Sequence, residues 1–169
     1  MLTPMLVDRQ WSLTQIGLLM SVAGASVGLL AAVAAARLLL RQRAATLLLR
    51  AGWLRSLAYL AVAGLLFSGL ADGSPLLLGP MVLVLLAIRY LAMTSLYALF
   101  MQLCSRQQAG TDFTVLVCFE LLVFFVGGSL SGFLAKGLGY ETYYLLLGAL
   151  SVLSVLLCKP IVLSLIHIS

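Results

Sequence analysis

Residues 76–103 read LLLGPMVLVLLAIRYLAMTSLYALFMQL, an apolar run in which Arg89 is the one formally charged residue. An α-helix rises about 1.5 Å per residue, and roughly 20 apolar residues cross the 30 Å hydrocarbon layer of a bilayer. The run is therefore long enough to cross a membrane as one helix. It predicts a transmembrane segment with an arginine near its midpoint.

Further apolar runs on both sides of this segment have comparable lengths. The last of them is the shortest, and it reaches a full span only if residues 138–141 or 161–163 extend it. At least four of the five runs lack a polar face, whereas the surface helices of soluble proteins carry one. The sequence therefore predicts an all-α, polytopic transmembrane bundle of about five spans, the other four lying at 13–40, 47–70, 113–134 and 143–158.

The overall composition agrees with a chain that has lipid as its solvent. Of 169 residues, 63% are hydrophobic and 9% are charged, whereas about a quarter of the residues of a soluble domain are charged. A water-facing surface of ordinary size cannot be built from this composition. The net charge of +5 does not indicate nucleic-acid binding, because the basic residues are few and are not interleaved with aromatic residues on a polar surface.

The sequence offers little for catalysis. It contains no HExxH, Walker or GxSxG motif, and its single histidine cannot form a nucleophile and base pair. Cys104, Cys118 and Cys158 lie in apolar runs without the spacing of metal ligands or redox pairs. We therefore expect no enzymatic activity, no cofactor and no metal site, and we interpret the cysteines as small hydrophobic residues.

The distribution of arginine and lysine predicts the orientation. Cytoplasmic connections of membrane proteins carry an excess of these residues. Around the first and third connections and after the last span stand Arg37, Arg41, Arg43, Arg50, Arg55, Arg106 and Lys159. The opposite side holds Arg9 and Lys136, together with Asp72 and Glu141. The connections at 41–46 and 104–112 are therefore predicted to be cytoplasmic, and Met1 and residues 71–75 external.

Two ionisable residues inside predicted spans are the main functional candidates, because charges in the hydrocarbon layer are costly. From helix geometry, Glu120 should lie about 10 Å and Arg89 about 20 Å from the cytoplasmic side, so direct contact is not expected. The functional interpretation is that Arg89 holds an anionic group of a substrate, while Glu120 takes part in proton coupling or shapes the cavity. The alternative is that each is neutralised by a partner in the missing half of the protein, or that Glu120 is protonated and only has its hydrogen bonds satisfied.

Residues other than Arg89 and Glu120 are candidates for substrate binding, helix capping or gating, or helix packing. Tyr90, Thr94 and Tyr97 follow Arg89 at helical spacing and could extend a polar, substrate-binding stripe or pack against a neighbouring helix. Thr111 or Asp112 is a candidate N-cap or gating residue at the start of the fourth span. Faces of small residues predict close helix packing, and they contain Gly24, Gly28, Gly128 and Gly132.

Several stretches resemble the carboxy-terminal half of a major facilitator superfamily permease. They are Arg89-Tyr-Leu-Ala-Met-Thr-Ser-Leu-Tyr-Ala-Leu-Phe-Met-Gln-Leu-Cys-Ser-Arg106, Gln108-Ala-Gly-Thr-Asp-Phe-Thr114 and Gly137-Leu-Gly-Tyr-Glu-Thr-Tyr-Tyr144. Within that family, the similarity is closest to bacterial inner-membrane importers of siderophores, of the rhizobactin and pyochelin type, and to muropeptide permeases. The opening, Pro4-Met-Leu-Val-Asp-Arg-Gln-Trp-Ser12 with Gln15-Ile-Gly17, resembles the external loop after the seventh helix.

This resemblance implies that residues 1–162 are helices eight to twelve of a twelve-helix fold, without the amino-terminal half. It implies proton-coupled import of a siderophore by alternating access, with muropeptide import as the close alternative. It also implies that the first, third and fourth spans help to line the route and that the second and fifth are peripheral. The Gly-x-x-x-Asp-Arg type loop of the superfamily is not reproduced at 36–43, which reads ARLLLRQR.

The alternative function comes from a different class of membrane protein. It is a non-transporting assembly or anchoring protein in which Arg89 and Glu120 bind only a partner. The external start on an odd number of spans favours a fragment of a longer chain. The final residues 163–169, which include His167, resemble the translation of a sequencing-library adapter. We therefore expect no function for them.

The topology can be tested by labelling engineered single cysteines in the longer protein with a membrane-impermeant reagent. Residues 41–46 and 104–112 should be protected in intact cells, and residues 71–75 should be labelled, because the positive charges lie beside the first two segments. Labelling at position 43 from the external side would contradict this orientation.

Overall fold

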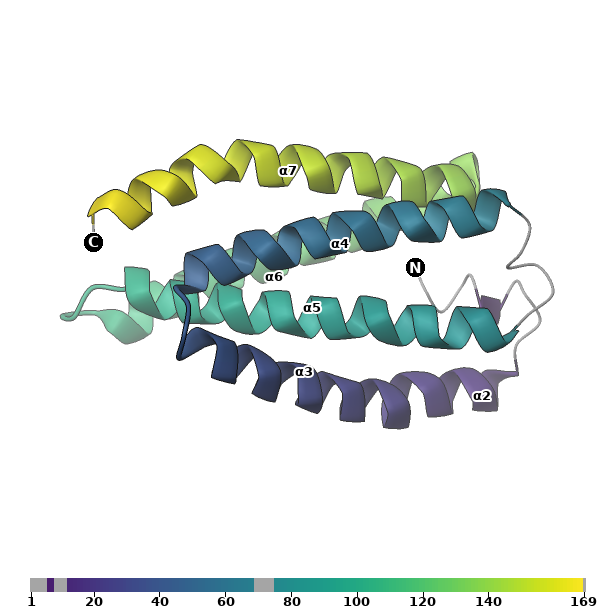
Figure 1. Cartoon of the computed structure of the whole chain (residues 1–169), viewed down its shortest axis with the longest axis horizontal. Helices are drawn as coiled ribbons and strands as arrows, with labels where there is room; N and C mark the ends of the chain where they lie inside the picture. The colour runs from purple at the N-terminus through teal and green to yellow at the C-terminus, as the bar shows by residue number, and fades with distance from the viewer. Residues whose placement is uncertain (1–5, 8–11, 69–74, 169) are drawn as a thin grey trace.

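The computed structural model in Figure 1 describes residues 6–7, 12–68 and 75–168, and regular structure within them is helical. The predicted all-α bundle is therefore confirmed. The elements in chain order are α2 Leu13–Gly17, η1 Leu18–Ala23, α3 Gly24–Leu39, α4 Ala44–Phe67, α5 Pro75–Leu103, α6 Ala109–Leu138 and α7 Tyr140–Ile168.

The first predicted span is one continuous helical segment with a π-helical portion. Ser12 caps it through a reciprocal capping box, in which its side chain accepts from the backbone N–H of Gln15 and the Gln15 side chain accepts from the backbone N–H of Ser12. The six residues of η1 then have π-helical hydrogen bonding, and α3 continues to Leu39. The predicted boundaries of 13–40 agree with these elements.

Helices α6 and α7 are longer than the sequence predicted at all four of their ends. Helix α6 begins at Ala109 and ends at Leu138, whereas residues 113–134 were predicted. Helix α7 begins at Tyr140 and continues to Ile168, so the fifth span is extended at both ends. Gly139 separates the two helices with a φ of 80°. A residue with a Cβ atom rarely adopts this conformation, which explains glycine here.

Four helical segments are long and apolar enough to cross a membrane, and the chain is therefore a membrane protein. They are Leu13–Leu39, Gly79–Leu103, Ala109–Leu138 and Tyr140–Pro160. Helix α4 begins three residues before the predicted second span, ends at Phe67 and has 24 residues, but it is not among these four. Arg50 and Arg55 in its first half reduce its average hydropathy. The structure therefore gives four spans by length and composition, with α4 as a fifth helix of spanning length.

The helices run along one common direction, and α4 lies in the middle of the bundle. Helices α3, α5, α4 and α7 lie side by side in that order, with α6 behind them in Figure 1. The α3–α4 and α5–α6 connections lie at the same end of the bundle. The predicted topology requires this arrangement, because it places both connections on one side of the membrane.

The apolar core is concentrated at the opposite end. Its buried side chains come from the last turns of α4, the first turns of α5 and α7, and the N-terminal region, and include Val62, Leu66, Val82, Tyr144 and Ile16. Helix α6 contributes Ala135, which is the one buried residue along its whole length. Helix α6 is therefore packed into the bundle near Ala135 and has little buried surface elsewhere.

Helices α4 and α7 approach each other closely because both carry small residues at their interface. A Cβ atom on Gly148 of α7 would lie 2.8 Å from Cδ2 of Leu60, and one on Gly52 of α4 would lie 2.7 Å from Cγ2 of Val155. The buried Ser56 donates its hydroxyl hydrogen to Ser151 Oγ across the same interface at 2.8 Å. Such small residues allow the close backbone approach that stabilises helix pairs in lipid.

Replacing Gly148 with valine should therefore separate α4 from α7. Overpacking of this kind costs about 1–3 kcal/mol, so we expect Gly148→Val to lower the melting temperature of the detergent-solubilised chain, measured by circular dichroism. Gly64→Val is the matched control, because a Cβ atom on Gly64 of α4 meets no described atom within 4 Å. Equal melting temperatures for the two variants would contradict a tight α4–α7 contact.

Candidate functional site

The strongest functional candidate, Arg89, lies at the middle of α5 and contacts α6. It is fourteen residues from either end of Pro75–Leu103, as the sequence predicted for the third span. Its guanidinium carbon lies 4.8 Å from the centroid of the Phe124 ring. The negative face of an aromatic ring attracts a cation at this distance. Arg89 therefore faces α6, and its guanidinium remains exposed.

Two turns further along α5, Tyr97 reaches the second candidate. The Tyr97 hydroxyl donates a 3.4 Å hydrogen bond to Oε2 of Glu120, which is half-buried on α6. The ring of Tyr97 also packs edge-on against Phe113 of α6, with 6.3 Å between centroids. Arg89, Tyr97, Phe113, Glu120 and Phe124 together define the α5–α6 interface.

Arg89 and Glu120 lie in the same interface without forming an ion pair. Glu120 is one helical turn from Phe124, the residue that Arg89 contacts, and its recorded partner is Tyr97. Among the residues that the structure describes, no carboxylate pairs with Arg89. The expected separation of the two groups therefore holds within the described chain, and a neutralising partner for Arg89 is not found there.

Tyr90 and Thr94 of the predicted polar stripe have partners other than α6. Tyr90 packs against α3, where a Cβ atom on Gly28 would lie 2.7 Å from Tyr90 Cε2. The Thr94 hydroxyl donates to the backbone carbonyl of Tyr90 at 2.9 Å. Tyr90 points about 100° away from Arg89 around the helix axis, and the substrate-binding role of Tyr90, Thr94 and Tyr97 stays a prediction. Tyr90 packs against a neighbouring helix, which was the alternative interpretation of this residue.

The predicted N-cap role of Thr111 or Asp112 is wrong, and the gating alternative stays a prediction. Helix α6 begins at Ala109, with Gln108 at the N-cap position, so both residues lie inside the first turn. Asp112 instead accepts two hydrogen bonds from Ser105, at 2.9 Å from its backbone N–H and 2.7 Å from its hydroxyl. Asp112 thus ties the first turn of α6 to the end of α5, while Thr111 is exposed.

The two pairs of small residues have different surroundings. Gly24 and Gly28 are buried on α3, where added Cβ atoms would lie 3.3 Å from Leu86 Cδ1 and 2.7 Å from Tyr90 Cε2. On α6, Gly128 meets no described atom within 4 Å, and Gly132 is half-buried. Close packing is therefore seen at the α3–α5 contact, and Gly128 faces open space.

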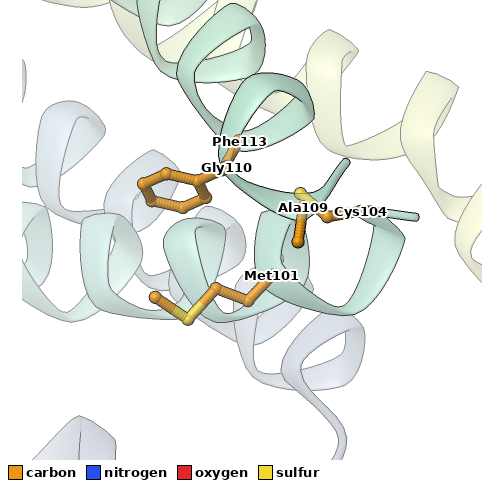
Figure 2. Close-up of a pocket in the computed structure, with 5 residues that line it drawn as sticks. All are labelled: Met101, Cys104, Ala109, Gly110 and Phe113. Atoms are coloured by element: carbon orange, nitrogen blue, oxygen red, sulfur yellow. The ribbon is translucent and has the colours of Figure 1, made fainter. Parts of the chain in front are cut away.

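A hollow lies at the end of the α5–α6 interface that carries the connecting turn. Its volume is about 340 Å³, and Figure 2 shows the side chains around it, which are Met101, Cys104, Ala109, Gly110 and Phe113. These residues give it a largely apolar lining without a charged group. The hollow therefore lacks the charged groups needed to recognise an anion, although Phe113 connects it to Tyr97.

The sequence reasoning missed one polar cluster, at the α4–α7 interface. Arg55 Nε donates to Ser151 Oγ at 3.3 Å, beside the hydrogen bond between Ser56 and Ser151. Arg55 had been placed near the cytoplasmic end of its helix, yet α4 begins at Ala44 and ends at Phe67, so Arg55 lies close to its midpoint. The placement of Arg55 beside the first connection is therefore wrong. The spacing of Gly52 and Ser56 was the signal available in the sequence.

Comparisons with known proteins leave the chain unassigned. No protein-family model matches the sequence, and no solved structure matches the fold. Among the described residues, no group of three or more histidine, cysteine, aspartate or glutamate side chains is placed to hold a metal ion. Function must therefore be argued from the charged groups within the helices.

Proposed function

We propose that the chain forms part of a secondary transporter of the bacterial inner membrane and imports a siderophore by proton-coupled alternating access. The observation that carries this proposal is the position of Arg89, which lies at the centre of a membrane-length helix with an aromatic ring as its contact. The resemblance of residues 89–106 to major facilitator permeases supports the same conclusion.

The energetics of Arg89 favour a wet or ligand-bound site. An arginine at the centre of a membrane helix costs about 2.5–3.5 kcal/mol even on the most favourable scale. A cation–π contact at an exposed position returns about 0.5–1 kcal/mol. The Phe124 ring therefore offsets only part of this cost, and the rest must come from water or from an anionic group that approaches Arg89.

The chemistry of a guanidinium selects the substrate class. Arginine remains protonated at all physiological pH values and presents a planar fork of N–H donors. Carboxylate, catecholate and hydroxamate oxygens match this fork and can accept two hydrogen bonds at once. Siderophores carry these groups, and muropeptides carry carboxylates, so muropeptide import remains the close alternative. Neighbouring genes for siderophore synthesis or for cell-wall recycling would distinguish the two.

Glu120 is suited to carry the coupled proton. It is half-buried within a membrane-length helix, and the Tyr97 hydroxyl supplies a hydrogen-bond partner from α5. A carboxyl group can bind and release a proton while this partner stays in place, because the tyrosine hydroxyl can both donate and accept. An anchoring protein without transport is the alternative function, and it predicts that neither Arg89 nor Glu120 affects solute uptake.

Arg89→Lys tests the role of the guanidinium fork, because lysine keeps the charge and loses the planar pair of donors. A charge-assisted hydrogen bond contributes about 1.5–3 kcal/mol, so we expect the half-saturation concentration for uptake by the full-length permease to rise about 10- to 100-fold. The yield of folded protein should not change. Arg106→Lys, at the exposed α5–α6 turn, is the control. Normal affinity in Arg89→Lys would contradict direct substrate binding.

Glu120→Gln tests proton coupling separately, because glutamine keeps the size and the hydrogen-bonding oxygen but cannot titrate. We expect the variant to fold with normal yield and to lose most of the uptake driven by an imposed pH gradient across proteoliposomes. Glu141→Gln, at the exposed start of α7, should transport normally. Unchanged uptake and unchanged pH dependence in Glu120→Gln would leave Glu120 with a structural role.

A further inference from the structure

The connection between α3 and α4 carries a cluster of exposed arginines. Residues 37–50 read RLLLRQRAATLLLR, and the exposed side chains of this basic cluster are Arg37, Arg41, Arg43 and Arg50. Residues 12–68, which include α3, the connection and α4, contain no aspartate or glutamate. Acidic side chains of these two helices therefore do not balance the positive charge of the basic cluster.

A hydrogen bond fixes Arg50 beside the connection. Arg50 lies six residues after the start of α4 at Ala44, or about 9 Å along the helix axis, and its Nη1 donates to Oε1 of Gln42 at 2.6 Å. Side chains of a helix tilt toward its amino terminus, so this long side chain reaches back to the end of the bundle. Gln42 stands between Arg41 and Arg43 in the chain. The Arg50 guanidinium therefore lies at the level of the two arginines in the connection.

An exposed apolar strip continues from Arg50 along the same face of α4. Trp53, Leu54 and Leu57 follow Arg50 by three, four and seven residues, which is the spacing of one helix face. Their exposed fractions are 41%, 49% and 62%. Helices α5 and α7 both pack against α4, but they leave these three side chains largely uncovered. The basic cluster thus stands at the head of an open apolar surface.

This combination has the polarity of a phospholipid. A headgroup phosphate accepts charge-assisted hydrogen bonds from arginine, which can donate two at once, and an acyl chain can lie along apolar side chains. A soluble phosphate ion would contact the same arginines but would gain nothing from Trp53, Leu54 and Leu57. The apolar strip below Arg50 therefore favours a lipid over a soluble anion.

We propose that Arg41 and Arg50 bind the headgroup phosphate of an anionic phospholipid whose acyl chain lies along the apolar strip, while Arg37 and Arg43 add positive charge around the phosphate. Basic residues clustered at the membrane end of a helix attract anionic lipids, and each strengthens binding about fivefold. Phosphatidylcholine carries the same phosphate beside a positive choline group, so it gains less. The inference goes beyond solute transport and does not depend on it, because none of these residues belongs to the α5–α6 interface.

The position of Trp53 beside Arg50 provides a direct measurement. The chain contains two tryptophans, Trp11 and Trp53, so Trp11→Phe leaves Trp53 as the only one. The full chain with this change is reconstituted in phosphatidylcholine bilayers that contain a minor fraction of phosphatidylglycerol brominated on its acyl chains. Bromine quenches tryptophan fluorescence only at short range. We expect brominated phosphatidylglycerol to associate with the site about fivefold or more tightly than brominated phosphatidylcholine at the same fraction.

Single substitutions in the Trp11→Phe background test the arginines. Arg41→Gln and Arg50→Gln should each lower the preference for phosphatidylglycerol about fivefold, because each removes one charge beside the phosphate. Arg106→Gln is the matched control, since it removes an exposed arginine from the α5–α6 connection at the same end of the bundle, and it should keep the preference. If Arg50→Gln fails to fold, Arg41→Gln gives the same comparison from a position between the two helices.

Three results would overturn the inference. The first is equal quenching by the two brominated lipids, and the second is a preference that survives both Arg41→Gln and Arg50→Gln. An equal loss in Arg106→Gln would show a general attraction of this end of the bundle to anionic membranes, without a site at α4. Inorganic phosphate separates the two sources of the anion: at equal ionic strength it should displace brominated phosphatidylglycerol no better than chloride does. Displacement by phosphate alone would assign the arginines to a soluble anion and reject the lipid.

Discussion

The close approach of α4 to α7 is the contact on which the rest of the bundle depends. Glycines at 52 and 148 remove the side chains that would separate the helices, and the side-chain hydrogen bond from Ser56 to Ser151 joins the two helices. In lipid, apolar side chains gain little by leaving the solvent, so packing and interhelical hydrogen bonds must hold helices together. With α7 fixed against one side of α4, α5 occupies the other side, and α3 packs against α5.

This arrangement separates the charged groups of the chain by position. Most basic residues surround the end that carries the α3–α4 and α5–α6 connections, where water and lipid headgroups are available. Arg55, Arg89 and Glu120 remain within the helices, and their recorded partners are hydroxyl groups and an aromatic ring. Neutral partners orient a charge without cancelling it. The interior groups thus stay available to a substrate or a proton.

The sequence predicted the helical class and most of the helices because long apolar runs leave few alternatives in a bilayer. Arg89 was placed correctly at mid-helix for the same reason. Helix ends were less predictable: α6 starts before Thr111 and Asp112 because Asp112 bonds back to Ser105 rather than capping the helix. Rotation about the helix axis was also not predictable, so the sequence left open whether Tyr90 joins the stripe of Arg89 or packs against a neighbouring helix, as it does at Gly28. Arg55 was missed because its importance depends on where α4 begins and on Ser151, 96 residues away.

The sparse packing of α6 has a mechanical consequence. Ala135 is the buried residue of α6 in the core, whereas Glu120 and Phe124 contact α5 from a segment of α6 without a buried residue. A rigid tilt of about 10° about Ala135 would displace Glu120, roughly 22 Å away along the axis, by about 4 Å. That movement exceeds the reach of a hydrogen bond, and Phe124 moves with Glu120 because one turn of helix joins them. A single tilt of α6 away from α5 would therefore separate Glu120 from Tyr97 and Phe124 from Arg89 at the same time.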